Sequence, residues 1–393
     1  MSLGSPLPGD VPLNVFVPKE IAPGERRVAL TPAVAGRIVK AGNSVGIERA
    51  AGNAAGFLDA DYQAAGATIV ASAQEGYRGA ALSVKVQRPL ANGPDELLLL
   101  PQGSALIAFL QPLTSPDYIA RLADRKITAL AMELIPRISR AQSMDALSSQ
   151  ATVAGYEAVL LAAQALPKFF PMLMTAAGTV PPAKVLVLGA GVAGLQAIAT
   201  ARRLGAVVTG FDVRAVVKEQ VESLGATFLG SPQADAEGAG GYAKELGAQQ
   251  QRRDQELIAA TAANMDVIIT TALIPGRPAP RLITAAAVQN MKPGAVIVDL
   301  AAEAGGNCEL SEPGHTVVKD GVTIMAPLNL ASSMPQHASM LYAKNVLALF
   351  SSIVRDGALA LDMNDEIAKG TCVTRDGQVV SEAVRSRLQG VKP

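Results

Sequence analysis

The strongest constraint on the fold is an alternation of short β-rich runs with Ala-rich helical stretches, which occurs in two successive series along the 393 residues. Such alternation is typical of parallel sheets covered by helices on both faces, because parallel strands need long crossover connections. The predicted fold class is therefore α/β, with two domains that each contain a parallel sheet.

The first series ends near residue 132 and the second begins near residue 184. In the first we predict strands at Asn14–Val17, Val45–Glu48, Thr68–Val70, Leu82–Val86, Ala105–Leu110 and Thr128–Met132, with helices such as Pro32–Ala41 and Pro116–Arg125. In the second we predict strands at Val185–Leu188, Val207–Phe211, Thr227–Leu229, Val267–Thr271 and Val296–Leu300, with helices at Val192–Leu204, Val216–Leu224, Gly241–Ala263 and Ile283–Met291.

The segments outside these series suggest how the chain is divided. Gln150–Ala177 is apolar and is expected to form helices that link the domains, and Gly178–Ala183 is expected to be the linker into the second domain. After a strand at Val322–Ala326, we expect one long helix at Ser339–Val354 and then a short tail. Because a helix this late commonly packs on the first domain, we expect a discontinuous N-terminal domain of residues 1–147 plus 333–393 and a second domain of residues 148–332.

Composition excludes several classes of function. Lys+Arg and Asp+Glu are balanced at 34 each, so no basic excess favours nucleic acid. Hydrophobic residues make up 49% of a chain that is too long for a single core. Cys308 and Cys372 form no disulfide or metal framework and are expected to be small buried residues. The near-apolar run Val185–Ala201 contains several glycines and is shorter than about 18 residues, so we expect no membrane span.

The most specific local motif is Gly-Ala-Gly-Val-Ala-Gly, residues 189–194, which lies between a predicted hydrophobic strand and a predicted amphipathic helix. In this context the first glycine permits a tight turn, the second allows a pyrophosphate to approach the backbone, and the third allows close helix packing. An acid about twenty residues later, Asp212, is expected to accept a ribose 2′-hydroxyl and favour NAD(H) over NADP(H), although Arg214 could accommodate a phosphate. We therefore predict a Rossmann-like NAD(H) site that includes Gly189, Ala190, Gly191, Val192, Ala193, Gly194, Asp212, Val213 and Arg214.

Two further loops follow predicted strands at the edge where open α/β sheets bind ligands. The loop after the fourth strand of the second series is expected to line the nicotinamide ribose with Thr271, Ala272 and Leu273. Asp299 follows the fifth strand, and from sequence alone it is as readily a turn carboxylate as a ligand contact.

The most unusual polar stretch is RISRAQSMDALSSQ, residues 137–150. If residues 141–149 form a helix, three-residue steps place on one face Gln142, Asp145 and Ser148 or Ser149. Together with Arg137, these groups could hold a carboxamide, and a hydride transfer between two nicotinamide rings needs only such positioning. A capped, solvated helix face explains the same pattern equally well.

This stretch, followed by Gly155-Tyr156, resembles the signature of the NAD(H)-binding component of proton-translocating nicotinamide nucleotide transhydrogenase. The resemblance extends from PKEIAPGERRVALTP (Pro18–Pro32) to GTCVTRDG (Gly370–Gly377), nearly the whole chain. It implies two Rossmann-like domains with the dinucleotide in the interdomain cleft. It also implies that the NAD(H) nicotinamide and its ribose are surrounded by Arg137, Gln142, Asp145 and Ser148, and that a loop carrying Tyr242 closes over the nucleotide.

The same resemblance implies an activity and partners. Hydride passes from NADH to NADP⁺ held on a separate NADP(H)-binding component, and a membrane proton-channel component couples the transfer to inward proton movement. The implied assembly contains a homodimer of this component. The resemblance also implies that this chain is cytoplasmic and that its partners hold it peripherally on the cytoplasmic face of the bacterial inner membrane.

Two other interpretations compete with this one. Alanine dehydrogenase shares the two-domain fold, and its family pattern supplies a lysine and a histidine for acid/base chemistry. Lys85 stands where the lysine belongs, but Gln111 replaces the histidine and cannot shuttle a proton, which leaves the role of Lys85 open. A non-catalytic NAD(H) sensor would have the glycine motif without the polar set between Arg137 and Ser148.

Overall fold

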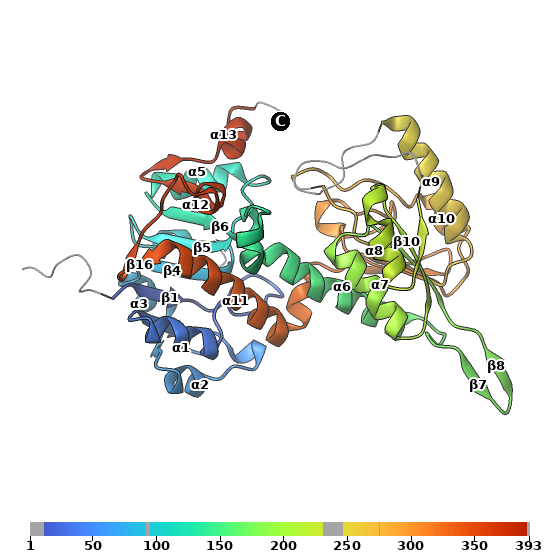
Figure 1. The fold of residues 1–393 in the computed structure, drawn as a ribbon, viewed down its shortest axis with the longest axis horizontal. Helices are drawn as coiled ribbons and strands as arrows, with labels where there is room; N and C mark the ends of the chain where they lie inside the picture. The colour runs from blue at the N-terminus through green and yellow to red at the C-terminus, as the bar shows by residue number, and fades with distance from the viewer. Residues whose placement is uncertain (1–11, 92–94, 231–246, 275, 391–393) are drawn as a thin grey trace, which may run out of the picture. The chain divides into compact units, whose positions relative to one another are not determined.

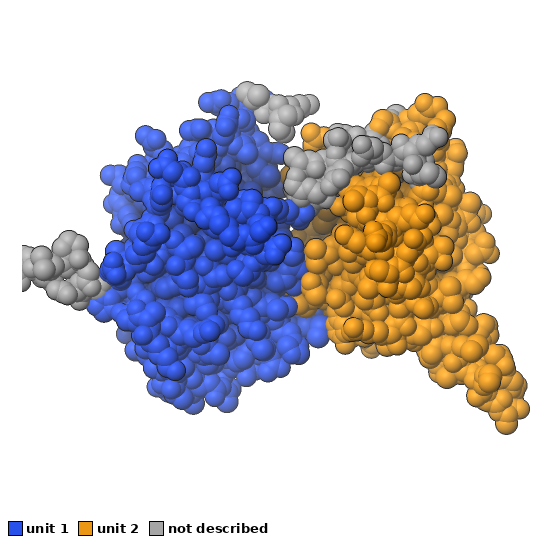
Figure 2. All heavy atoms as spheres, viewed as in Figure 1, with its two compact units in different colours: residues 1–150, 332–393 blue, residues 151–331 orange. Residues whose placement is uncertain are grey.

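A computed structural model describes residues 12–91, 95–230, 247–274 and 276–390. The chain divides into two compact units: unit 1 contains residues 1–150 and 332–393, and unit 2 contains residues 151–331 (Figure 2). Unit 1 is therefore built from two separate stretches of sequence, whereas unit 2 is continuous.

Unit 1 contains a mostly parallel eight-stranded sheet in the order β19-β18-β6-β5-β4-β1-β2-β3 (Figure 1). The strands in chain order are β1 Asn14–Val17, β2 Ser44–Glu48, β3 Thr68–Val70, β4 Leu82–Gln87, β5 Ala105–Phe109, β6 Thr128–Ala131, β18 Cys372–Arg375 and β19 Gln378–Val379. The first six strands run parallel, and the chain reverses its direction of growth between β1 and β4, which is the topological switch point of a doubly wound sheet.

Helices cover both faces of this sheet, which explains why its central strands are largely apolar, with Ser83 and Lys85 of β4 as buried exceptions. Val15 and Val17 of β1 pack in a core cluster with residues of the helices at 32–40 and 335–353, whereas Phe16 points into a second cluster with residues of the helices at 73–78 and 116–124. The helices of unit 1 are α1 Pro32–Lys40, α2 Asp59–Ala64, α3 Ala73–Arg78, α4 Glu96–Leu99, α5 Pro116–Asp124, α11 Pro335–Ile353, α12 Glu366–Thr371 and α13 Glu382–Leu388, with short 3₁₀ turns η1 Asn53–Ala55, η2 Met132–Leu134 and η3 Ser139–Met144.

The C-terminal segment is more structured than the short tail predicted from the sequence. After α11 the chain forms a small hairpin, β16 Val354–Arg355 with β17 Ala358–Leu359, and then α12. Strand β18 adds to the sheet antiparallel to β6, and β19 pairs with β18. The prediction was wrong here because β18 pairs with β6, more than 240 residues away in the sequence. Thr374 Oγ1 of β18 also donates to Ile127 O, over a separation of 247 residues.

Unit 2 contains a seven-stranded sheet in the order β11-β10-β9-β12-β13-β15-β14. Its strands are β9 Lys184–Leu188, β10 Val207–Phe211, β11 Thr227–Leu229, β12 Val267–Thr270, β13 Val296–Asp299, β15 Val322–Met325 and the antiparallel edge strand β14 Thr316–Lys319. Its helical elements include α7 Val192–Arg203, η4 Ala215–Val217, α8 Lys218–Ser223, α9 Ala248–Ala262, α10 Ala285–Gln289 and η6 Ala302–Ala304. The carboxyl ends of β9 and β12 lie at the switch point of this sheet.

Helix α6, Ala146–Ala165, is followed by a two-stranded hairpin rather than by the further helices predicted up to Ala177. The hairpin strands are β7 Leu173–Thr175 and β8 Gly178–Val180, so part of the predicted linker is a strand. Figure 1 shows this hairpin as an arm that extends from the body of unit 2. Within the described ranges, no helix has both the length and the apolar character that crossing a bilayer requires.

Candidate functional site

The turn after β9 exposes backbone rather than side chains at the switch point of unit 2. Gly189 has a φ of +96°, which a side chain would disfavour, and its N–H donates to Phe211 O at 2.8 Å. A Cβ added to Gly194 would lie 1.8 Å from Gly189 O, so only glycine permits this contact between helix and strand. A Cβ added to Gly191 would meet no atom within 4 Å, which leaves open space directly before α7.

The N-terminus of α7 points into this open space. Gly191 is the N-cap residue and supplies no side-chain hydrogen bond, so the first N–H groups of a twelve-residue helix are not capped by a side chain. Val192 begins the helix and Ala193 follows it. Such a terminus provides both donors and partial positive charge for an anion.

Gly155 is a further residue on which this turn depends, and the sequence patterns gave it no role of its own. A Cβ at Gly155 of α6 would lie 2.1 Å from Ala193 O, so α6 can pack on the turn only because residue 155 is glycine. A glycine inside a long predicted helix was the available signal, because glycine disfavours helix interiors unless close packing requires it.

Asp212 is almost fully buried and stabilises the turn from the next strand. Its Oδ2 accepts from Ala190 N at 2.7 Å and from Arg214 Nη2 at 2.8 Å. Its Oδ1 accepts from Arg214 N and Arg214 Nε, both at 2.9 Å. The half-buried Val213 lies between the two charged residues. The carboxylate is thus held in place by the glycine turn on one side and by a guanidinium on the other.

The loop after β12 lies against the same turn. Thr271 N donates to Leu188 O at 2.8 Å, and Thr271 Oγ1 donates to Gly189 O at 3.0 Å. Asn307, a residue to which the sequence patterns assigned no role, fixes Ala272 through two hydrogen bonds: its Oδ1 accepts from Ala272 N, and its Nδ2 donates to Ala272 O. Leu273 is exposed beyond them.

Asp299 serves as a turn carboxylate. It is fully buried, and its two oxygens accept five hydrogen bonds from the residues around it. The donors are Thr270 Oγ1, Ala301 N, Asn307 N, Cys308 N and Ser311 Oγ. This arrangement favours a structural role for Asp299 over a ligand contact, because the residue is 0% exposed and five donors of the chain surround its two oxygens, whereas Asp212 keeps 6% of its surface exposed.

The polar stretch from Arg137 to Gln150 in unit 1 is not one helix, as the three-residue steps had assumed. The 3₁₀ turn η3 ends at Met144, and α6 begins at Ala146. Asp145 lies between them with φ −69° and ψ 86°, outside helical geometry. Its side chain accepts from Ser148 N at 2.9 Å and from Ser148 Oγ at 2.6 Å, which is an N-cap arrangement.

The structure therefore brings Asp145 and Ser148 together directly, through two hydrogen bonds. Gln142 lies on the exposed side of η3, and Arg137 is exposed just before it. Tyr242 falls outside the described residues. The predicted set in unit 1 thus contains one fixed pair and two side chains that face outward.

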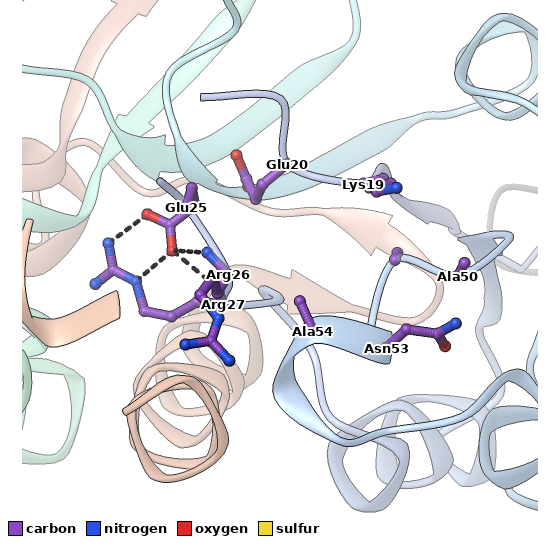
Figure 3. Close-up of a pocket in the computed structure, with 9 residues that line it drawn as sticks. Lys19, Glu20, Glu25, Arg26, Arg27, Ala50, Asn53 and Ala54 are labelled. Atoms are coloured by element: carbon purple, nitrogen blue, oxygen red, sulfur yellow. Dashed lines mark hydrogen bonds and ion pairs between the residues drawn. The ribbon is translucent and has the colours of Figure 1, made fainter. Parts of the chain in front are cut away.

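A small pocket lies beside the switch point of unit 1 and has a volume of about 200 Å³. Figure 3 shows Glu25 and Arg27 paired on one side and η1 opposite them. The pocket is lined by Lys19, Glu20, Glu25, Arg26, Arg27, Ala50, Ala51, Asn53 and Ala54.

The buried arginine of this pocket is already neutralised. Arg27 Nη2 lies 2.6 Å from Glu25 Oε2, and Arg27 Nη1 donates to Gln150 Oε1 at 2.8 Å. Gln87 Nε2 donates to the same Glu25 oxygen at 2.9 Å. Although burial alone would raise it, these contacts lower the pKa of Glu25 to about 2. The charged groups here satisfy one another.

Lys85 is fully buried beside the pocket, in a cluster of opposite charges. Its Nζ lies 2.8 Å from Glu96 Oε1 and 3.4 Å from Glu20 Oε2. Burial raises the pKa of Glu20 to about 7, against the opposing effect of Lys85. Burial also acts to lower the pKa of Lys85, but the two carboxylates raise it above its ordinary value. Lys85 is therefore a structural cation held by ion pairs.

Gln111, which follows β5, does not form part of this cluster. It is exposed, adopts a φ of +55°, and its N–H donates to the Glu133 carboxylate. Burial raises the pKa of Glu133 to about 6. The two histidines of the sequence, His315 and His337, belong to other segments.

Comparison with known proteins identifies relatives over the whole length. The family described as alanine dehydrogenase/PNT matches with its N-terminal domain at residues 16–154 and its C-terminal domain at residues 158–382. The chain is 51% identical over 379 residues to the first part of the NAD(P) transhydrogenase alpha subunit of Rhodospirillum rubrum, covering 95% of this chain and 99% of that protein. The crystal structure of transhydrogenase from Sinorhizobium meliloti is 45% identical with a TM-score of 0.85, covering 93% of this chain and 99% of that one. A solved L-alanine dehydrogenase is 29% identical with a TM-score of 0.80, covering 96% and 100%.

Proposed function

The chain belongs to the alanine dehydrogenase/PNT family, and on that premise we propose that it is the NAD(H)-binding component of a proton-translocating transhydrogenase. The observation that carries the proposal is the glycine turn of unit 2, which leaves the N-terminus of α7 open beside Gly191 while Asp212 closes the turn. An acid in this place favours a free ribose 2′-hydroxyl and disfavours a 2′-phosphate.

These residues fit a dinucleotide. The open space at Gly191 and the donors at the start of α7 suit a pyrophosphate, and Ala190, Val192, Ala193 and Gly194 complete the turn. Val213 and Arg214 would flank the adenosine ribose, and Thr271, Ala272 and Leu273 would lie along the nicotinamide ribose. Tyr242 would close over the bound nucleotide. NADH supplies the hydride.

For the nicotinamide end we propose Arg137, Gln142, Asp145 and Ser148. None of these groups has to gain or lose a proton during the reaction, because a hydride moves without an accompanying proton. Their contribution is to bind and orient the ring and to exclude water.

The geometry of unit 1 disfavours a self-contained alanine dehydrogenase. Reductive amination requires groups that exchange protons beside the substrate. Lys85 is buried between two carboxylates, and Gln111 cannot carry a proton. A pure NAD(H) sensor would have no use for the polar set near Gln142.

We further propose the partners and location of the chain. Hydride would pass to NADP⁺ on an NADP(H)-binding component, and a membrane proton-channel component would couple this step to proton translocation. The chain would act as a homodimer, with folding domains 1–147 plus 333–393 and 148–332. It would be cytoplasmic and peripheral, on the cytoplasmic face of the bacterial inner membrane. The name of the relative from Rhodospirillum rubrum, the first part of an alpha subunit, supports the existence of other subunits.

The decisive experiment is stopped-flow hydride transfer from NADH to an NADP⁺ analogue, with the purified chain and a transhydrogenase NADP(H)-binding component. We expect rapid transfer that neither protein supports alone. Gln142→Asn should slow the transfer by roughly tenfold or more while leaving NADH affinity nearly unchanged, because it disturbs ring positioning. Gln63→Asn, an exposed glutamine on α2, is the matched control and should transfer at the normal rate.

Failure would take recognisable forms. NADH binding without transfer to any competent partner would contradict the proposal, and pyruvate with ammonium would then be the substrates to test. Equal rates for Gln142→Asn and Gln63→Asn would remove Gln142 from the site and leave the rest of the proposal standing.

A further inference from the structure

The segment that carries Gln142, Asp145 and Ser148 has little regular structure of its own. The 3₁₀ turn η3 covers only residues 139–144, and 3₁₀ hydrogen bonds are weaker than those of an α-helix. Asp145 then interrupts the backbone pattern before α6. A fixed position for this segment must therefore come from contacts with another element.

That element is α11, which belongs to the C-terminal stretch of unit 1. Ala141 and Met144 of η3 are buried in the same core cluster as Tyr342 and Val346 of α11. Apolar contacts of this kind hold the turn against the helix without specifying the rotation of its exposed side. Directional hydrogen bonds are needed for that.

Asn345 of α11 supplies them from a nearly buried position. Its Nδ2 donates to Ser143 O at 2.8 Å, and its Oδ1 accepts from Ser149 Oγ at 2.7 Å. A carbonyl oxygen can only accept, so the amide is fixed with its nitrogen toward Ser143. One side chain thus binds the backbone immediately after Gln142 and the hydroxyl immediately after Ser148.

The contact continues on the far side of Ser149. Gln150 Nε2 donates to Ser149 Oγ at 3.2 Å and to Ala338 O of α11 at 3.1 Å. Arg27 Nη1 donates to Gln150 Oε1 at 2.8 Å. These bonds hold the start of α6, at Gln150, to α11 and to Arg27 independently of Asn345. Loss of the Asn345 side chain should therefore release mainly the other end of the segment, at Ser143 next to Gln142.

We propose that Asn345 is a positioning residue for hydride transfer, which holds Gln142 in its working orientation through the backbone carbonyl of Ser143. This rests on the proposed function, because Gln142 is placed at the nicotinamide only there. Asn345 itself need touch neither nucleotide. Its effect is expected on the rate of transfer and not on the affinity for NADH.

The test is Asn345→Leu, which removes both hydrogen bonds at similar side-chain volume, with Ser149→Ala as a milder variant that removes one. Single-turnover transfer from NADH should slow roughly tenfold or more for Asn345→Leu, since small misplacements near the reacting atoms are costly. The NADH dissociation constant should stay within about threefold, since uniform binding is left intact. Amide hydrogen exchange should rise at residues 142–149.

Thr374→Val is the matched control, because Thr374 is also buried in unit 1 and donates one hydrogen bond, to Ile127 O at 2.7 Å. It should lower the unfolding temperature without slowing transfer. A positioning role also predicts non-additivity: in a Gln142→Asn background, Asn345→Leu should slow transfer by less than about threefold more.

Each outcome decides the question. Asn345→Leu that slows transfer no more than Thr374→Val, or by the same factor in both backgrounds, overturns the positioning role. Unchanged exchange at residues 142–149 overturns it as well. If the wild-type chain binds NADH and transfers no hydride, the proposed function itself fails, which is distinct from a working wild type with a silent Asn345→Leu.

Discussion

The first five strands follow the same order in both units, which differ at the edge where that order would place a ligand. In unit 2 the chain leaves β9 through glycines and presents bare backbone next to the N-terminus of α7. In unit 1 it leaves β1 through Lys19 and Glu20, and the corresponding edge carries the ion pairs of Lys85 and Arg27 beside a small pocket. The same topology thus presents open backbone donors in unit 2 and mutually paired charged side chains in unit 1.

The difference shows that a topological switch point does not by itself make a ligand-binding site. Whether a ligand occupies it depends on the few residues that follow the central strand. Glycines leave backbone donors exposed, whereas acidic and basic side chains consume each other's capacity for hydrogen bonds. Four experiments test this contrast between the two units, and the one with the greatest expected effect comes first.

The largest effect should come from separating the two roles of glycine in the turn of unit 2. Gly194→Ala must displace Gly189 O, which a new Cβ would approach to 1.8 Å, so both folding of the turn and NADH binding should be lost. Gly191→Ala meets no atom within 4 Å and should fold normally, yet its methyl group should block a pyrophosphate. Thermal unfolding and NADH titration distinguish them. Normal NADH affinity in Gly191→Ala would contradict the idea of close backbone approach.

Next in size is the loss of the buried cation of unit 1. Lys85→Met leaves Glu20 and Glu96 without their positive partner, and breaking a buried ion pair on one side costs about 3–5 kcal/mol. Urea unfolding measures the change. The control Lys40→Met, at an exposed position of α1, should cost less than about 0.5 kcal/mol. A small effect at Lys85 would mean that the cluster does not stabilise unit 1.

The pH dependence of stability should reveal Glu20. Its folded pKa of about 7 lies above the ordinary 4.5, so the folded state keeps a proton that the unfolded chain has lost. Stability from this group is full below pH 4.5 and falls by about 3 kcal/mol as the pH rises through 7.

Glu20→Gln should flatten this decline. Glu133, with a pKa of about 6, acts in the same sense but at lower pH, and Glu25, lowered to about 2, acts only in acid. The decline between about pH 6 and 7 is therefore the part assigned to Glu20. Urea midpoints measured across that interval would refute the assignment if Glu20→Gln and the unaltered chain fell equally.

A smaller effect is expected at the acid of unit 2. Asp212→Asn removes a charged acceptor worth about 1.5–3 kcal/mol, so NADH should bind roughly tenfold to hundredfold more weakly and discrimination against NADPH should relax. Arg214→Ala removes the guanidinium that pairs with Asp212 and should sharpen discrimination. Competition titrations with both nucleotides measure this. An unchanged preference in Asp212→Asn would place selectivity elsewhere.

Sequence patterns predicted the strands well because both faces of each sheet are buried. An apolar run such as Val267–Thr270 needs no partner to be recognised, and its prediction was one residue too long. Asp212 was predicted to follow a strand, and it does so directly after Phe211. The α/β class with two Rossmann-like units is confirmed.

The failures concern features that depend on distant partners or on local competition. The hairpin β7–β8 is largely exposed and lacks the buried apolar run that marks the other strands, and strand β18 is completed only by pairing with the distant β6. At Asp145 the side chain competes with the helix for backbone donors, so the steps of three residues gave a misleading shared face. The structural role of Lys85 could not be predicted, because Glu20 lies 65 positions away in the sequence and only the fold brings it close.

The discontinuity of unit 1 also sets an order of events during synthesis. Strands β1–β6 leave the ribosome long before α11 and β18 exist, so β6 remains an open edge, exposed to wrong pairing, until residues 372–375 arrive. Tyr342 OH of α11 donates to Lys85 O of β4 across 257 residues, so this buried hydrogen bond cannot form until α11 has been synthesised. Unit 2, continuous in sequence, can complete its sheet first. A nascent chain stalled before α11 should therefore depend on chaperones only for the first stretch of unit 1, residues 1–150.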